Sequence, residues 1–133
     1  MFPELSFHHI GIACHDIGRT LKFYEAMGYT ASSVVDDEVQ HVKVCFLDKQ
    51  DAPRIELLEP LDEQSPVART LSTSGVTPYH LCYQVTDIEE TVGLLRNERF
   101  LLLNGPVPAV AMGDLRVAFL YRKDVGLIEL VEN

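Results

Sequence analysis

The sequence predicts an α+β fold built from two tandem modules, each with the element order β-α-β-β-β. Each half of the chain begins with a β-branched apolar run, continues with a helical pattern and ends with further strand-like runs. A histidine also precedes an aspartate by 7 residues in both halves, as His9–Asp16 and as His80–Asp87. An internal duplication explains this agreement better than chance does.

A second pair of landmarks supports the duplication. In the segments VCFL and VAFL a phenylalanine lies 10 residues before a glutamate, as Phe46–Glu56 and as Phe119–Glu129. Each glutamate is the centre of an Ile-Glu-Leu tripeptide. A repeat this long indicates two fused modules rather than a solenoid. We expect a single domain over 1–133, with modules at about 5–59 and 77–133 and a connector at 60–76.

In the first module, residues 7–14 predict a buried strand. Asp16 is the expected N-cap of the helix that follows, and Gly28 is its expected C-terminal stop. One helix face carries apolar residues at helical spacing, namely Ile17, Leu21 and Tyr24. Further strands are expected at 29–35, 40–47 and 54–58.

The connector predicts a short helix that begins at Ser65-Pro66, with proline at its first position, and ends at Gly75.

In the second module, residues 79–85 predict a strand. Thr86 and Glu89 have capping-box spacing, which indicates a helix start. The apolar face of this helix is expected to contain Ile88, Val92 and Leu95. Strands are expected at 99–103, 115–121 and 126–131. The segment 104–114 has two prolines and two glycines, which predicts a loop.

Composition and charge exclude some classes of function. With 20 acidic and 11 basic residues the formal charge is −9, so the chain repels phosphate backbones and nucleic acid is not an expected partner. A small anionic substrate stays possible if a local basic cluster exists, and Lys22, Arg122 and Lys123 are its candidates. No run approaches the ~18 apolar residues of a membrane helix, so no membrane partner is expected.

The cysteines indicate a reducing compartment. The chain has three cysteines, an odd number, and no two of them have CxxC spacing. We therefore expect Cys14, Cys45 and Cys82 to be buried thiols and the protein to be cytoplasmic. The N-terminal segment MFPELSFHH has no basic region followed by an apolar one, as a signal peptide would have.

The duplicated positions predict a metal site. Glu56 and Glu129 have apolar neighbours on both sides, and a carboxylate in such a strand is costly to bury unless it is paired or bound to a cation. A pseudo-two-fold axis would bring them together with His9 and His80. Two imidazoles and two carboxylates suit one divalent ion, either zinc, nickel, cobalt, manganese or iron. Three other histidines are expected to have no role in this site, namely His8, His15 and His41.

Several segments resemble the vicinal-oxygen-chelate (glyoxalase) superfamily. The opening HHIGIA, followed by D-I and LKFYE, is typical of that family. The segments IELLEPLDEQSPVA, YHLCYQVTDIE and VAFLYRKDVGLIEL are most similar to its methylmalonyl-CoA epimerase branch. The resemblance implies paired modules whose mixed sheet curves into a cup around the metal. Carried over by position, its metal ligands are His9, Glu56, His80 and Glu129.

The resemblance also implies a chemistry. The metal would stabilise an enolate while a proton is removed next to a carbonyl, and Glu129 would be both ligand and base. Some epimerases use a second glutamate in the strand that holds Lys43 here, so this lysine departs from the pattern. Tyr79-His80 stands where the epimerases have paired histidines, which leaves a different acyl substrate open. A homodimer is expected from the family.

Four functions fit these residues to different degrees. The leading hypothesis is a metal-dependent epimerase of an acyl-CoA thioester such as methylmalonyl-CoA. Glyoxalase I, which acts on the hemithioacetal of methylglyoxal and glutathione, uses the same ligand types. A non-catalytic binding protein of the resistance type would generally lack the ligand set. An extradiol dioxygenase prefers two histidines and one carboxylate, so Glu56 argues against it.

Overall fold

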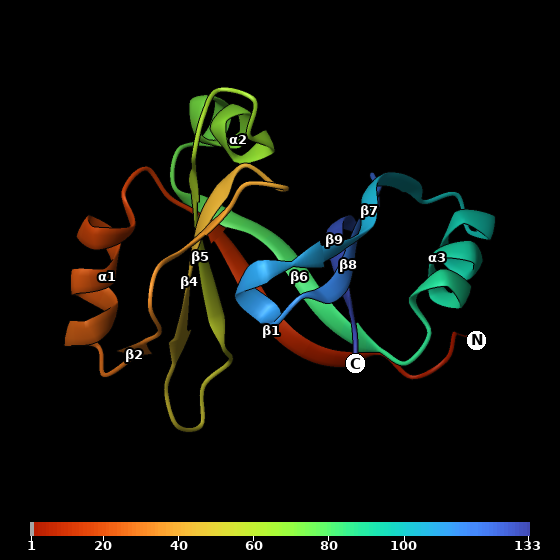
Figure 1. The fold of residues 1–133 in the computed structure, drawn as a ribbon, viewed down its shortest axis with the longest axis horizontal. Coiled ribbons are helices and arrows are strands. Elements are labelled where there is room, and N and C mark those ends of the chain that lie inside the picture. Colours follow the sequence, from red (N-terminus) through yellow and green to blue (C-terminus); the bar gives the residue numbers. More distant parts are fainter. Residues whose placement is uncertain (1) are drawn as a thin grey trace. The chain divides into compact units, whose positions relative to one another are not determined.

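A computed structural model describes residues 2–133 and confirms the α+β fold class (Figure 1). The described residues contain nine strands and three α-helices. The first βαβββ series is β1 (Ser6–Ala13), α1 (Ile17–Ala26), β2 (Thr30–Ala31), β3 (Val35–Asp37), β4 (Val42–Asp48) and β5 (Ile55–Pro60), followed by α2 (Pro66–Ser74). The second is β6 (Thr77–Val85), α3 (Ile88–Asn97), β7 (Leu101–Ala109), the 3-10 helix η1 (Val110–Met112), β8 (Leu115–Arg122) and β9 (Gly126–Glu132).

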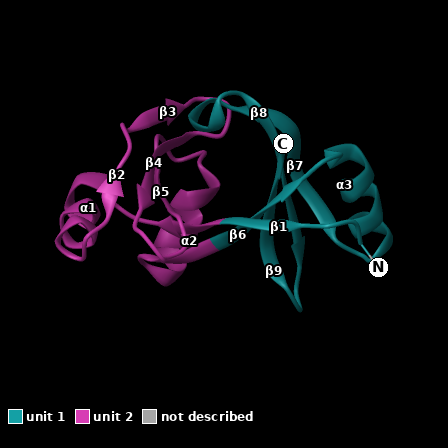
Figure 2. Ribbon diagram, turned by 90° about the horizontal axis from the view of Figure 1, so that it is seen from below, with its two compact units in different colours: residues 1–8, 80–133 teal, residues 9–79 magenta. Residues whose placement is uncertain are grey.

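The chain divides into two compact units, and each is described by itself (Figure 2). Unit 2 contains residues 9–79, and unit 1 contains residues 1–8 and 80–133. None of the described helices is long and apolar enough to cross a membrane.

In unit 2, the strands follow the order β2-β4-β5-β1, and β3 pairs with β4. Strands β4 and β5 are antiparallel, while β1 and β5 are parallel. Successive side chains point to opposite faces of a strand, so each sheet has a helix face and an opposite face. On the helix face, α1 packs over a buried cluster that contains Cys14, Ile17, Cys45, Leu47, Ile55 and Leu57.

The predicted start and end of α1 are confirmed. Asp16 is its N-cap, and its carboxylate accepts a hydrogen bond from the Arg19 backbone N–H at 3.1 Å. Gly28 follows the last turn with a φ of 99°, a conformation that glycine adopts without strain. The α2 helix likewise begins after Ser65 with Pro66 in its first turn and ends at Gly75.

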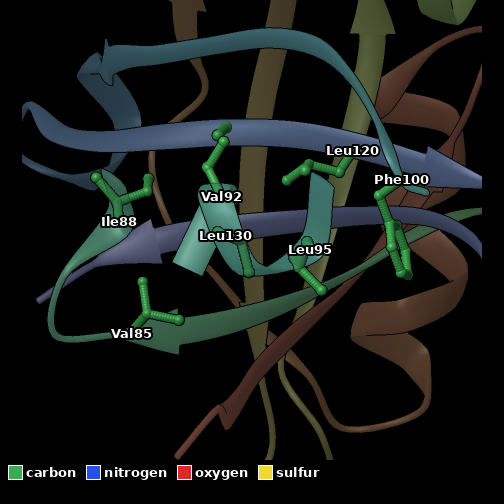
Figure 3. Packing of buried hydrophobic residues seen from close by; sticks show 8 residues of the cluster. Val85, Ile88, Val92, Leu95, Phe100, Leu120 and Leu130 are labelled. Atoms are coloured by element: carbon green, nitrogen blue, oxygen red, sulfur yellow. The ribbon is translucent and has the colours of Figure 1, made fainter. Parts of the chain in front are cut away.

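In unit 1, the strands follow the order β6-β9-β8-β7. Strands β6 and β9 are parallel, and the pairs β9–β8 and β8–β7 are antiparallel. Figure 3 shows the core between α3 and this sheet. The predicted helix residues all belong to it, since the cluster contains Val85, Ile88, Val92, Leu95, Phe100, Ala118, Leu120 and Leu130.

Three predictions about local structure were wrong. The strand expected at 29–35 is two short strands, β2 and β3, separated by residues 32–34. The N-cap of α3 is Asp87, whose carboxylate accepts from the Glu90 N–H at 3.0 Å, and not Thr86. Aspartate is at least as good an N-cap as threonine, so the capping-box spacing misplaced the start by one residue.

The third error concerns the segment 104–114, which was expected to be a loop. Its first half continues β7 to Ala109 and pairs with β8, with register shifts near Asn104. In the strand order of unit 1, β7 is an edge strand. A proline is tolerated at an edge because its missing N–H is not needed on the open side, so Pro106 and Pro108 do not end the strand.

Candidate metal centre

The first predicted pair of ligands is brought together within unit 2. His9 lies in β1 and Glu56 in β5, and the two strands are adjacent and parallel, with Gly11 opposite Glu56. The His9 Nε2 atom is 3.2 Å from a carboxylate oxygen of Glu56. His9 is 0% exposed and Glu56 is 4% exposed. Both side chains point away from α1, because Ile55 and Leu57 on either side of Glu56 belong to the helix-face cluster.

The second pair repeats this geometry within unit 1. His80 lies in β6 and Glu129 in β9, with Cys82 opposite Glu129 in the parallel register. The His80 Nε2 atom is 3.0 Å from a carboxylate oxygen of Glu129. His80 is 4% exposed and Glu129 is 2% exposed. Each unit therefore holds one buried imidazole against one buried carboxylate, on the sheet face opposite its helix.

An aromatic ring contacts each imidazole from the neighbouring strand. Phe46 lies opposite Glu56 in the β4–β5 register, and its ring meets the His9 ring edge-to-face at 5.3 Å and 77°. Phe119 lies opposite Glu129, and its ring meets the His80 ring at 5.3 Å and 83°. These contacts limit rotation of both imidazoles. The repeated segments VCFL and VAFL marked the two phenylalanines in the sequence, although no role was expected of them.

The surroundings of the second pair are apolar. Cys82, Val117 and Val131 are buried together on the face that carries His80 and Glu129, and Phe119 packs against them. Such a wall keeps water away and strengthens electrostatic interactions at the pair.

Comparison with known proteins decides the family. Residues 8–119 match the Glyoxalase/Bleomycin resistance protein/Dioxygenase superfamily. The chain belongs to this superfamily.

Its relatives place the chain in the epimerase branch. Ethylmalonyl-CoA/methylmalonyl-CoA epimerase of Cereibacter sphaeroides is 30% identical over 129 residues, which cover 92% of this chain and 94% of the relative. A variant of Streptomyces coelicolor methylmalonyl-CoA epimerase, solved in complex with 2-nitronate-propionyl-CoA, has a TM-score of 0.83 at 31% identity, covering 98% of this chain and 99% of that one. Methylmalonyl-CoA epimerase from Mycobacterium tuberculosis has a TM-score of 0.84 at 26% identity, covering 99% and 92%.

Within this superfamily fold, Lys43 does not share the face of the ligand pair. Cys45 and Leu47, at alternate positions of the same strand, belong to the helix-face cluster, and the β4–β5 register is continuous. Lys43 therefore points to the helix face, where Glu59 lies opposite it. In the duplicated module the equivalent residue is Arg116, whose guanidinium donates to a carboxylate oxygen of Glu132 at 2.9 and 3.1 Å. The basic residue at this position therefore lies on the helix side of each module.

The two modules differ two residues before the proposed ligand glutamate. Arg54 lies two residues before Glu56, and its guanidinium is 5.5 Å from the Phe46 ring centroid. It also donates to both carboxylate oxygens of Asp48, at 2.8 and 3.1 Å. The position equivalent to Arg54 in the second module is Leu127. The cation that contacts Phe46 therefore has no counterpart at the equivalent position of the second module.

The remaining candidates lie outside the two pairs. The ring of His41 is 2.9 Å from a carboxylate oxygen of Asp62, and both side chains are partly exposed. His15 is exposed in the loop before α1. Among the basic candidates, Lys22 is exposed on α1, while Arg122 donates to the Glu98 carbonyl oxygen at 2.9 Å.

Proposed function

We infer that this protein is a metal-dependent epimerase of an acyl-CoA thioester of the methylmalonyl-CoA type. The observation that carries this inference is the duplicated buried pair, His9 with Glu56 and His80 with Glu129, in a chain whose relatives are named epimerases. A relative's complex with a propionyl-CoA nitronate supports an acyl-CoA as the substrate class.

In this proposal the members of the two pairs are the ligands of one divalent ion. Their donor set of two imidazoles and two carboxylates fits zinc, nickel, cobalt, manganese or iron, and octahedral ions would keep two positions for substrate oxygens. Burial supports the fit, because ionised carboxylates away from water require compensating charge. When bound, such an ion would supply a Lewis acid that acidifies the C–H next to the thioester carbonyl.

In the same proposal Glu129 is the base that moves the proton at the α-carbon. Its carboxylate is held by the β6–β9 register and lies against His80, whose ring is contacted by Phe119. Val117 and Val131 flank this face and exclude water, so that a proton taken from the substrate is not lost to solvent at once. Positioned proton transfer of this kind contributes roughly 10²–10⁴-fold to a rate.

Metal content tests the ligand set. The untagged protein is reconstituted with divalent ions and bound metal is counted by elemental analysis, beside His80→Ala and Glu129→Ala. About one ion per chain in the wild type, lost in both variants, is the expected result. His41→Ala is the matched control, because it removes a histidine that contacts a carboxylate outside the two pairs. Absence of metal in the wild type would contradict the proposed centre.

Solvent isotope exchange tests the reaction. Methylmalonyl-CoA incubated with the metal-loaded protein in D₂O should gain deuterium at its α-carbon. Glu129→Gln should slow this exchange by about 10²-fold or more. The hemithioacetal of methylglyoxal and glutathione is assayed in parallel, since glyoxalase I uses the same ligand types. Turnover of the hemithioacetal without α-exchange of any acyl-CoA would reassign the protein to glyoxalase I chemistry.

A further inference from the structure

Each strand that carries a proposed ligand glutamate also carries a second glutamate, three residues later. Because three is an odd number, the second side chain lies on the helix face. Glu59 accepts a hydrogen bond from the Ile17 backbone N–H at 2.8 Å. Glu132 accepts one from the Ile88 backbone N–H at 3.0 Å. Ile17 and Ile88 are the first residues of α1 and α3, so a glutamate of each ligand strand binds the N-terminus of the helix that covers it.

The same hairpins contact the opposite ends of the helices. The Lys49 ammonium donates to the Met27 carbonyl oxygen at 2.8 Å, and the Arg122 guanidinium donates to the Glu98 carbonyl oxygen at 2.9 Å. Met27 and Glu98 are the C-cap residues of α1 and α3. An anion at the N-terminus and a cation at the C-terminus is the arrangement that the helix dipole favours.

We call this arrangement the helix clamp, formed by Lys49 and Glu59 in unit 2 and by Arg122 and Glu132 in unit 1. The two clamp residues are 10 apart in the sequence of both modules. In the sequence the proposed ligand glutamate lies between them, and it shares β5 or β9 with the second clamp residue, on the opposite face of that strand. The clamp therefore ties the β4–β5 and β8–β9 hairpins, which carry the proposed ligand glutamates, to both ends of their helices.

The clamp of unit 1 has an additional contact. Arg116 donates to a carboxylate oxygen of Glu132 at 2.9 and 3.1 Å, and to a carboxylate oxygen of Glu89 on α3 at 2.7 Å. Glu132 is therefore tied both to the helix backbone and to a cation that reaches the helix. The same strand carries Glu129, the proposed base. A misplaced base slows proton transfer, so its position matters most for the rate.

We propose that Glu59 and Glu132 are positioning residues for Glu56 and Glu129. The proposal rests on the metal centre described under the proposed function. A ligand shell works only if its members are held within about 0.5 Å of the productive geometry. Loss of supporting contacts to metal ligands typically lowers metal affinity by about 10–100-fold. The clamp supplies such support from the other side of the sheet.

Cobalt binding tests the proposal, because Co²⁺ gives a visible spectrum that reports its ligand geometry. Affinity and spectrum are measured for Glu132→Ala and Glu59→Ala at a temperature where every variant is folded. Affinity should fall at least about 10-fold and the visible bands should shift. Glu132→Gln keeps an acceptor for the Ile88 N–H and should recover most of the affinity.

The matched controls are Asp87→Ala and Asp16→Ala. They remove a carboxylate from the same helix N-termini, but these aspartates precede the helices and are not in the ligand strands. They should lower the unfolding temperature and leave cobalt affinity within about 2-fold. Equal affinity loss in Glu132→Ala and Asp87→Ala, or none in either, would overturn the positioning role. No cobalt binding by the wild type would instead overturn the metal centre, and the positioning role with it.

Discussion

The three cysteines show how burial controls the chemistry of a single side chain. Cys14, Cys45 and Cys82 are all 0% exposed. Burial raises the pKa of Cys14 to about 11 and raises that of Cys45, because a thiolate loses its hydration in the core. The three buried thiols pack as small apolar side chains, in agreement with their expected structural role.

Alkylation measures this burial. At pH 8, iodoacetamide should modify none of the three cysteines in the native protein within minutes, because they are inaccessible and Cys14 and Cys45 stay protonated. In urea all three should react, as counted by intact mass. Rapid native modification of Cys14 would contradict the buried placement.

The lowered pKa of Glu132 makes the stability of the fold depend on pH in the acid range. Its pKa is lowered below the usual 4.5, first by the hydrogen bond from the Ile88 N–H and then by Arg116. A lowered folded-state pKa stabilises the fold above the unfolded value, and this stabilisation is lost as pH falls through the folded value. The stability gap between the wild type and Glu132→Gln should therefore shrink as pH falls below about 4.5. Denaturant unfolding from pH 6 to pH 3 measures it, and a constant gap would contradict the shifted pKa.

At the scale of elements, β7 depends on a close approach to β8. A Cβ atom on Gly105 would collide with the Val117 carbonyl oxygen, and the φ of Gly105 is 90°. Only glycine fits this position without moving one of the strands. The helix α3 offers the opposite case, since nothing lies within 4 Å of a Cβ built on Gly93.

These two glycines make a matched pair for mutagenesis. Gly105→Ala should lower the free energy of unfolding by about 2 kcal/mol or more, through collision and an unfavourable φ. Gly93→Ala should raise it by about 0.5–1 kcal/mol, because alanine is the better helix former. Chemical denaturation of both variants measures the difference, and a stabilised Gly105→Ala would contradict the strand assignment.

The duplication explains what the sequence could predict at this scale. It predicted the element order and the two pairs that meet within their units, His9 with Glu56 and His80 with Glu129, because both are local to a repeated pattern. The segments IELLE and IELVE also repeat the second glutamate, Glu59 and Glu132. Their hydrogen bonds to the helix N-termini could not be predicted, because a glutamate near a strand end more often faces solvent. The edge strand at 104–109 could not be predicted, because proline is excluded from a strand only where its N–H is needed.

At the scale of the whole molecule, the proposed metal centre predicts that stability depends on the ion. Metal that binds only the folded state stabilises it by about 2.7 kcal/mol at 100 times its Kd. For a chain of 133 residues this corresponds to roughly 10 °C in Tm. Thermal unfolding with and without the ion should show this rise in the wild type and not in His80→Ala. An equal rise in both would place the metal elsewhere.

The outer strands of the two sheets bear on self-association. A free sheet edge can pair with another chain and seed aggregates. At the outer edge of unit 2, β2 has two residues and β3 has three. At the edge of unit 1, β7 carries Pro106 and Pro108 at alternate positions, and each proline lacks a backbone N–H donor. Each edge therefore offers few free backbone donors and acceptors to a strand of another chain. Replacing both prolines with threonine should increase light scattering of concentrated samples, and unchanged scattering would show that the prolines do not protect the edge.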